Sequence, residues 1–245
     1  MDLHEYQAKE LLRKFGLPLL SGKFYENNLN NIDHDLSILN GPPWVVKSQI
    51  HAGGRGSGYF KSSVNNKGGV QIVKSKDEAK KVANAMLNNT LVTKQTGIEG
   101  KKVRRIFIEE GCEIQTEYYL SFLIDRKTSK LMMMISSSGG VDIEKVAETN
   151  PEKINNVFFP NLNSFNIEDK LKSLLNFNND EFNQFKIIVE KLGKAFVKLD
   201  ASTIEINQLV LNKSGKLVLL DAKISLDDNA LFRHPELLTL KDISE

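Results

Sequence analysis

The sequence predicts an α+β fold of two lobes, each a mostly antiparallel sheet with helices. Three apolar runs, RIFIEE, YYLSFLIDR and KLMMMISS, follow one another between residues 105 and 137 with only short turns between them. Such short connections favour antiparallel pairing, because a parallel crossover needs a dozen or more residues. The 245 residues are enough for one large domain or two small ones.

The N-terminal part of the chain predicts a helix and then two strands joined by a loop. Asp2 is expected to cap the opening helix, and residues 27–40 are expected to form a surface loop with a short helix. WVVKSQI (44–50) predicts a buried strand, and VQIV (70–73) predicts the strand that returns beside it. The connection between them is rich in glycine and serine, which is typical of a loop.

Further helices follow from capping and periodicity. Ser75 and Glu78 stand at the N-cap and N3 positions of a capping box, so a helix is expected to run to about residue 86 and to close a βαβ-like unit. Helical periodicity returns near 168–176 and is stronger over 180–199. The last core element is predicted to be a β-hairpin.

Composition excludes several classes of protein. The 33 basic residues are interspersed with 31 acidic ones, and the net charge of +2 does not indicate a nucleic-acid partner. The apolar runs are too short to span a bilayer, so no membrane association is expected. The single cysteine, Cys112, excludes an internal disulfide framework and a cysteine-based zinc site. With no targeting signal in MDLHEYQAKELL, these features predict a cytoplasmic location.

A glycine-rich loop directly after the first buried strand could bind phosphate. HAGGRGSG (51–58) has four glycines in six residues, which leaves backbone N–H groups available to an anion, and Arg55 adds donors. Its spacing matches neither a P-loop nor a dinucleotide fingerprint, and a hairpin loop without a ligand is the alternative. Lys47 interrupts the apolar strand, so we expect an anionic group to meet it unless the side chain reaches solvent.

The C-terminal hairpin, STIEINQLVLN and KLVLLDAK, predicts a cation site. If the KSG between them forms a three-residue loop with its glycine in the left-handed region, Asn207 lies opposite Asp221. Glu205 then meets Lys223 on the same face. A carboxylate beside an amide oxygen suits Mg²⁺, with nucleotide phosphates as further ligands. A solvated polar face is the alternative, and a register shift of one residue would disperse the cluster.

Two carboxylates mark the connection between the predicted lobes. Glu109 ends one strand and Glu117 begins the next, so this segment could offer its backbone to an adenine and a carboxylate to ribose hydroxyls. Solvated acidic side chains are the alternative. Cys112 has no histidine near it in the sequence, so nucleophilic hydrolase chemistry is not supported.

Short motifs run from the first residues nearly to the last: LHEYQAKELL, PWVVKSQIHAGGRG, LVTKQT, GGVDIEKVAE, IEINQLV, LDAK and NALFRHPEL. In this order they resemble the β subunit of succinate–CoA ligase (succinyl-CoA synthetase). The resemblance implies an ATP-grasp fold over residues 1–240, with a smaller lobe (about 20–110) inserted into a larger one (1–20 and 110–240). Members of that family continue into a flavodoxin-like domain that binds coenzyme A, which we expect to be absent from this chain.

The resemblance also implies roles for individual residues. The phosphates of the nucleotide would be held by Lys47, Gly54, Arg55 and Gly56. The base and ribose pocket would be lined by Glu109, Cys112 and Glu117. Mg²⁺ would be bound by Asn207 and Asp221, and Glu205 would face a phosphohistidine arriving from a partner chain. Catalysis would then be mostly charge neutralisation by Lys47, Arg55 and the metal ion.

The implied reaction belongs to the citric acid cycle. It interconverts succinate, coenzyme A and a nucleoside triphosphate with succinyl-CoA, a nucleoside diphosphate and phosphate, and the phosphoryl group travels on a histidine of the α subunit. The expected partners are therefore that α subunit and ATP/ADP or GTP/GDP, with coenzyme A and succinate bound through the full complex. The chain alone is expected to be inactive. Alternatives are the β subunit of malate–CoA ligase and a nucleotide-binding module without catalytic duty.

Four features depart from the usual pattern of that family. The loop Ser57–Lys67 is longer, Gln208 replaces a common proline, Ala222 a common glycine and Ser138 a common glutamate. These differences bear on how the phosphate loop closes and on how the region near Ser138 meets a partner.

Overall fold

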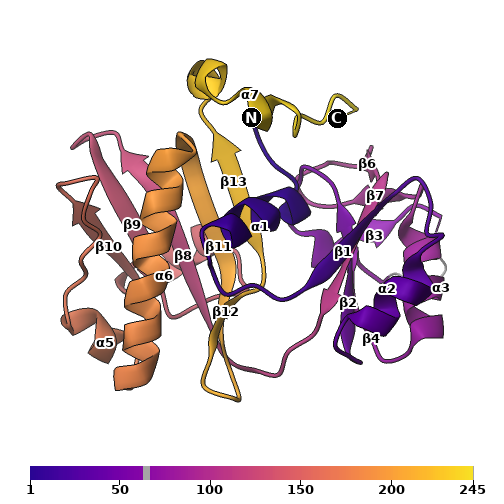
Figure 1. Ribbon diagram of the computed structural model, residues 1–245, viewed down its shortest axis with the longest axis horizontal. Coiled ribbons are helices and arrows are strands. Elements are labelled where there is room, and N and C mark those ends of the chain that lie inside the picture. The colour runs from indigo at the N-terminus through magenta and orange to yellow at the C-terminus, as the bar shows by residue number, and fades with distance from the viewer. Residues whose placement is uncertain (63–66, 245) are drawn as a thin grey trace. The chain divides into compact units, whose positions relative to one another are not determined.

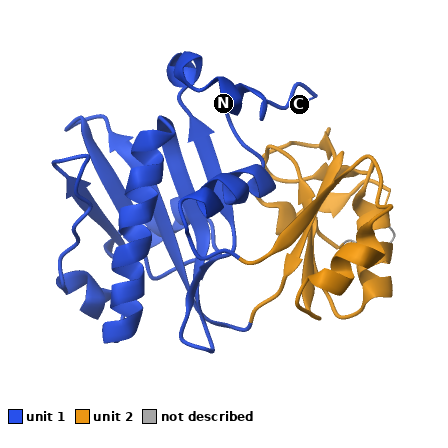
Figure 2. Ribbon diagram, in the orientation of Figure 1, with its two compact units in different colours: residues 1–19, 113–245 blue, residues 20–112 orange. Residues whose placement is uncertain are grey.

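The computed structural model describes residues 1–62 and 67–244, and its chain forms two compact units (Figures 1 and 2). The larger unit consists of Met1–Leu19 and Glu113–Glu245, and the smaller unit is Leu20–Cys112. The smaller unit is therefore inserted in the sequence of the larger one. Residues 63–66 of the long loop Ser57–Lys67 lie outside the described residues.

The larger unit is built on one antiparallel sheet with the strand order β10-β9-β8-β11-β12, in which β13 also pairs with β11. Its strands are β8 (Ile114–Asp125), β9 (Lys130–Ser136), β10 (Ile154–Phe159), β11 (Ala201–Asn212), β12 (Leu217–Leu219) and β13 (Ala222–Leu226). The pairing of β8 with β9 confirms the antiparallel arrangement expected from their short connection. The run RIFIEE, for which the same arrangement was expected, belongs instead to a sheet of the smaller unit.

Helices of the larger unit are α1 (Glu5–Lys14), α4 (Ile143–Thr149), α5 (Lys170–Leu174), α6 (Asn179–Lys198) and α7 (Pro235–Leu238), with 3₁₀ turns η2 (Pro151–Lys153) and η3 (Asp228–Arg233). The longest, α6, begins with a reciprocal capping box between Asn178 and Glu181. Its apolar face, including Phe185 and Leu192, is fully buried in the core and packs on β11, β12 and β8 (Figure 1). The helix expected over 180–199 is confirmed.

The start of the chain differs from the sequence prediction. The N-cap of α1 is His4, not Asp2. Asp2 instead forms a backbone bridge with Ser225, and its carboxylate accepts the Ser225 hydroxyl at 2.5 Å. The N–H of Leu3 also donates to the carbonyl of Ile224 at 3.0 Å. Pairing with β13 therefore holds the first residues extended, and this tertiary contact overrides the local capping preference of aspartate.

The smaller unit contains two antiparallel sheets, with strand orders β1-β7-β2-β4 and β3-β5-β6. The first consists of β1 (Gly22–Glu26), β2 (Trp44–Gln49), β4 (Val70–Val73) and β7 (Arg105–Glu110), and the second of β3 (Tyr59–Phe60), β5 (Thr90–Val92) and β6 (Lys101–Lys102). Its helices are α2 (Ile32–Ile38), α3 (Lys76–Met86) and the 3₁₀ turn η1 (Arg55–Ser57).

Most local predictions for this unit are confirmed. Strands β2 and β4 pair antiparallel, and the Ser75 hydroxyl accepts the Glu78 N–H at 3.1 Å at the start of α3. The expected βαβ-like unit is also present: β4 precedes α3, and β7, the next strand of this sheet along the chain, runs parallel to β4 with β2 between them. Strand β5, which the sequence did not predict, belongs to the second sheet. Leu91 of β5 pairs with Phe60 on one side and Lys101 on the other, and it is completely buried. The second sheet thus depends on pairings between residues distant in sequence.

Among residues 1–62 and 67–244, no helix is long and apolar enough to cross a membrane.

Candidate functional site

The C-terminal hairpin has the register that the sequence predicts. Gly215 adopts the left-handed conformation with φ of 75°. Glu205 pairs with Lys223, and the Asn207 N–H donates to the Asp221 carbonyl at 3.1 Å. Asn207 and Asp221 are therefore directly opposite each other, as expected.

The two residues with oxygen-bearing side chains lie where the sheet is irregular: the pairing of β11 with β8 shifts register between Ile206 and Leu209, and β12 ends at Leu219 while β13 begins at Ala222. Ile204 and Ile206 are completely buried and face the core, whereas Glu205, Asn207 and Asp221 are half-buried. An amide oxygen together with a carboxylate is a donor set that fits Mg²⁺, which binds a few protein oxygens and keeps some of its waters.

The side chain of Asn207 also holds a neighbouring loop, which the sequence did not indicate. Its Oδ1 accepts the Gly140 N–H at 2.8 Å, and its Nδ2 donates to the Val141 carbonyl at 3.1 Å. The Gly139 N–H in turn donates to the Glu117 carbonyl of β8 at 3.2 Å. An amide oxygen has two lone pairs, so Asn207 Oδ1 can accept this N–H and still bind a cation.

Gly140 brings the loop against another candidate residue, Glu117. It has a φ of +69°, and a Cβ at this position would overlap the Glu117 carboxylate and lie close to the Gln208 amide. Glycine is therefore favoured by the backbone conformation, and a larger residue would also displace the ends of these two side chains. The GG of the GGVDIEKVAE motif thus joins Asn207 and Glu117, two residues for which the sequence argument had separate roles.

Glu205 lies in a group of acidic and phenolic side chains. Its carboxylate is 3.5 Å from the Lys223 ammonium. Burial raises the pKa of Tyr119 to about 12, and the negative charge of Glu205 adds to this effect. The hydrogen bond that Glu144 shares with Asp142 raises the pKa of Glu144, to which Glu205 also contributes. The negative charge of Glu205 therefore acts on both Tyr119 and Glu144.

The raised pKa of Tyr119 predicts a loss of stability in alkali. Its pKa rises from 10.0 to about 12 on folding, so the unfolded chain loses this proton first. The contribution of the protonated Tyr119 hydroxyl to the free energy of unfolding is fully present below about pH 10, and it is lost as the pH rises through about 12. At about pH 11 the difference from pH 8 should be about 1.4 kcal/mol. Urea unfolding of Tyr119→Phe at both pH values should show an alkaline loss smaller by this amount, and an equal loss in both proteins would contradict the assignment.

In the smaller unit, Lys47 meets a carboxylate. Lys47 of β2 and Glu109 of β7 form an ion pair between Nζ and Oε1, with side chains 8% and 2% exposed. They are diagonal neighbours, because Lys47 pairs with Phe107 and Glu109 pairs with Val45. The alternative of a lysine reaching solvent is wrong. The sequence predicted no contact between Lys47 and Glu109; the available signal was a single lysine in the apolar strand WVVKSQ and a pair of glutamates at the end of RIFIEE.

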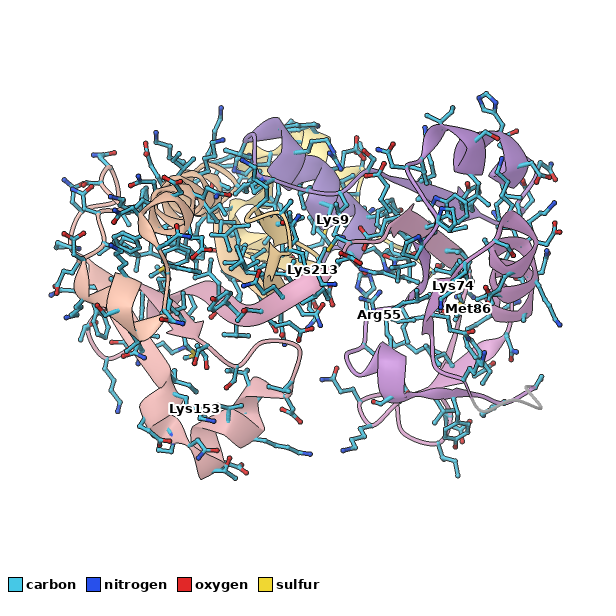
Figure 3. All side chains as sticks on the ribbon, turned by 90° about the horizontal axis from the view of Figure 1, so that it is seen from below. Lys9, Arg55, Lys74, Met86, Lys153 and Lys213 are labelled. Carbon is cyan, nitrogen blue, oxygen red and sulfur yellow. The ribbon has the colours of Figure 1, made fainter. Side chains whose placement is uncertain are left out.

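Two side-chain hydrogen bonds hold the glycine-rich loop, one between Gln95 and the loop backbone and one from Arg55 of the loop to β2. Gly54 is left-handed with φ of +71°, and the N–H of Gly53 donates to Gln95 Oε1 at 2.5 Å. Arg55, labelled in Figure 3, is 9% exposed, and its guanidinium donates to the Ser48 carbonyl of β2 at 2.9 Å. Gln95, from the LVTKQT motif, is a loop-positioning residue to which the sequence argument gave no role.

Cys112 ends the smaller unit and is half-buried. Glu110 precedes it by two residues, and its carboxylate accepts the N–H and the side-chain amide of Asn40, each at 2.9 Å. It also accepts the Ser21 N–H at 3.3 Å. Glu110 therefore joins the end of β7 to Ser21 and Asn40 by hydrogen bonds. The carboxylate of the preceding residue, Glu109, forms the buried ion pair with Lys47.

The family follows from a comparison with known proteins. Residues 2–211 match the family model described as an ATP-grasp domain. The chain belongs to the ATP-grasp family. It is 47% identical over 248 residues to the ADP-forming succinate–CoA ligase subunit beta of Acidiphilium cryptum, and 46% identical over 248 residues to that of Rickettsia bellii. The match covers 100% of this chain and 62% of each relative, so the chain spans less than two thirds of their length.

Solved structures support the same fold. ATP citrate lyase from Methanothrix soehngenii, in complex with citrate and coenzyme A, superposes with a TM-score of 0.72 at 18% identity, covering 100% of this chain and 55% of that one. A dinucleotide-forming acetyl-coenzyme A synthetase from Ca. Korarchaeum cryptofilum gives 0.63 at 16% identity, covering 92% and 93%. At these identities the likeness concerns the fold alone, and it confirms the predicted ATP-grasp architecture of antiparallel sheets with helices.

Proposed function

We propose that this chain is the nucleotide- and magnesium-binding part of a succinate–CoA ligase β subunit. The observation that supports the proposal is the register of the C-terminal hairpin, in which Asn207 lies opposite Asp221 and both residues are half-buried. The motifs around these residues lie within an alignment at 47% identity to an ADP-forming succinate–CoA ligase subunit beta. That similarity does not favour the alternative of a malate–CoA ligase.

The proposed roles divide between the two units. In the smaller unit, the phosphates are bound by Lys47, Gly54, Arg55 and Gly56, and the base and ribose by Glu109 and Cys112. In the larger unit, Glu117 binds the ribose, and Asn207 and Asp221 bind Mg²⁺. The metal ion, when bound, neutralises phosphate charge. The chain's own cationic groups add to this by fixed charges that need no reorganisation during transfer.

The proposed reaction transfers a phosphoryl group between a nucleotide and a phosphohistidine on an α subunit. Glu205 is the residue that faces this histidine, because it lies two residues from Asn207 on the same face of β11 and attracts a protonated ring. Coenzyme A and succinate belong to the complete complex. The proposal includes ADP/ATP as the nucleotide and a cytoplasmic location, which the single cysteine supports.

Calorimetric titration tests this function. We expect the 245-residue chain to bind ATP more tightly with Mg²⁺ than with EDTA. Asp221→Asn should weaken binding in Mg²⁺ by roughly tenfold, because about 1.5 kcal/mol is the lower end for a contact to a charged group. The same variant should bind like wild type in EDTA. A wild-type chain whose ATP affinity does not depend on Mg²⁺ would show that the proposal is wrong.

A further inference from the structure

Lys9 is a buried charge for which the proposed function has no use. It lies on α1, it is 1% exposed as a residue, and it is among the largest fully buried side chains of the described chain (Figure 3). Its Nζ is 3.2 Å from Glu5 Oε1, and both side chains are 2% exposed. Two apolar side chains of similar volume in place of a buried ion pair are often at least as stable. Stability alone therefore does not explain why α1 buries this pair.

The ammonium of Lys9 makes a second contact that lies outside the helix. It donates to the backbone carbonyl of Leu220 at 2.6 Å. Leu220 lies where the partner of β11 is interrupted, because β12 ends at Leu219 and β13 begins at Ala222. The Leu220 N–H points the other way, to the Gln208 carbonyl at 2.9 Å. The Leu220 carbonyl, between β12 and β13, is therefore held by a charge-assisted hydrogen bond from Lys9 of α1.

The residue after Leu220 is Asp221, the proposed magnesium ligand. The peptide group between them is planar, so the direction of the Leu220 carbonyl also sets the direction of the Asp221 N–H. The Asp221 carbonyl accepts the Asn207 N–H at 3.1 Å. The backbone of Asp221 is therefore fixed on both sides, by Lys9 before it and by Asn207 after it.

We propose that Lys9 is a positioning residue for the metal site, acting through the Leu220 carbonyl to orient the Asp221 carboxylate, with Glu5 as its counter-charge. This inference rests on the proposed function, since it assumes that Asp221 binds Mg²⁺. Groups that orient metal ligands typically change metal affinity by about 10- to 100-fold when removed. The N-terminal motif LHEYQAKELL then serves the metal site although it is far from it in sequence.

The test separates positioning from helix stability with two variants of the 245-residue chain. Glu5→Leu/Lys9→Met removes both buried charges and the contact to Leu220. Glu5→Gln removes the negative charge that pairs with Lys9 and retains the lysine. For each protein, the Tm is measured without ligand, and ATP is titrated by calorimetry over a series of Mg²⁺ concentrations to find the Mg²⁺ midpoint.

We expect the double variant to keep a Tm near that of wild type. Its Mg²⁺ midpoint for ATP binding should be about tenfold higher than that of wild type. Glu5→Gln should show the opposite pattern, a lower Tm with an unchanged midpoint. A folded double variant with the wild-type midpoint, or a midpoint raised equally in Glu5→Gln, would overturn the positioning role. If the double variant does not fold, Glu5→Gln/Lys9→Met, which also has no charge at these positions, replaces it. Failure of the proposed function is distinguishable, because wild type and Asp221→Asn would then show no difference in Mg²⁺ dependence.

Discussion

Replacing Lys47 by methionine is expected to destabilise the smaller unit by about 3–5 kcal/mol, because it leaves a buried carboxylate without its counter-charge. Glu109 is 1% exposed, and its ion pair with Lys47 joins the central strands β2 and β7. The single tryptophan, Trp44, lies on β2 and is 3% exposed. Its fluorescence during urea unfolding therefore reports on this unit directly.

The matched control for Lys47→Met is the double variant Lys47→Met/Glu109→Leu. Removing both charges should recover most of the stability, since an apolar pair of similar volume packs in the same space. It should not recover ATP binding, because the proposed contacts of Lys47 with the phosphates and of Glu109 with the base and ribose are both missing. A double variant that is stable and binds ATP like wild type would mean that Lys47 and Glu109 serve only the fold.

The second large effect is expected at Gly140. Gly140→Ala should lower the free energy of unfolding by about 1–2 kcal/mol through its left-handed backbone. It should also weaken ATP binding by roughly tenfold or more, since one lost hydrogen bond to a charged group corresponds to about 1.5–3 kcal/mol. The reason is that the added Cβ takes the space of the Glu117 carboxylate, which must turn away. Calorimetry with ATP and Mg²⁺ measures the change in affinity.

Gly215→Ala is the matched control for Gly140→Ala. Gly215 has a similar φ of +75°, but nothing lies within 4 Å of a Cβ placed there. Both variants should therefore show the same backbone strain, and only Gly140→Ala should lose affinity for ATP. Equal affinities for ATP in the two variants would show that neither Glu117 nor the Gly139–Gly140 loop contributes to nucleotide binding.

Local signals were sufficient for the hairpin. The register of β11 against β12 and β13 depends on a three-residue loop and one left-handed glycine, and both are visible as KSG. Once this register is set, the period of two along a strand decides which side chains share a face. Asn207 and Asp221 could therefore be placed together before any coordinates were known, although their role as metal ligands stays a prediction.

The capped helices and apolar strands were also predictable, because caps and hydrophobic periodicity act over a few residues. The Ser75 cap of α3 and the buried strand β2 were both found in this way. Asp2 shows the limit of such arguments. Its side chain suits an N-cap, but pairing with Ser225, more than 200 residues later in the chain, decides its conformation.

What the sequence by itself determined was the antiparallel class, the strands β2, β4, β8 and β9, the helices α3 and α6, and the register of the C-terminal hairpin. Only the tertiary structure decided that Lys47 is neutralised by Glu109, that Asn207 holds the Gly140 loop and that Lys9 reaches the Leu220 carbonyl. The physical reason is distance along the chain. A turn limits its two strands to a few registers, whereas contacts between distant segments depend on how whole sheets and helices pack, which no local pattern of residues records.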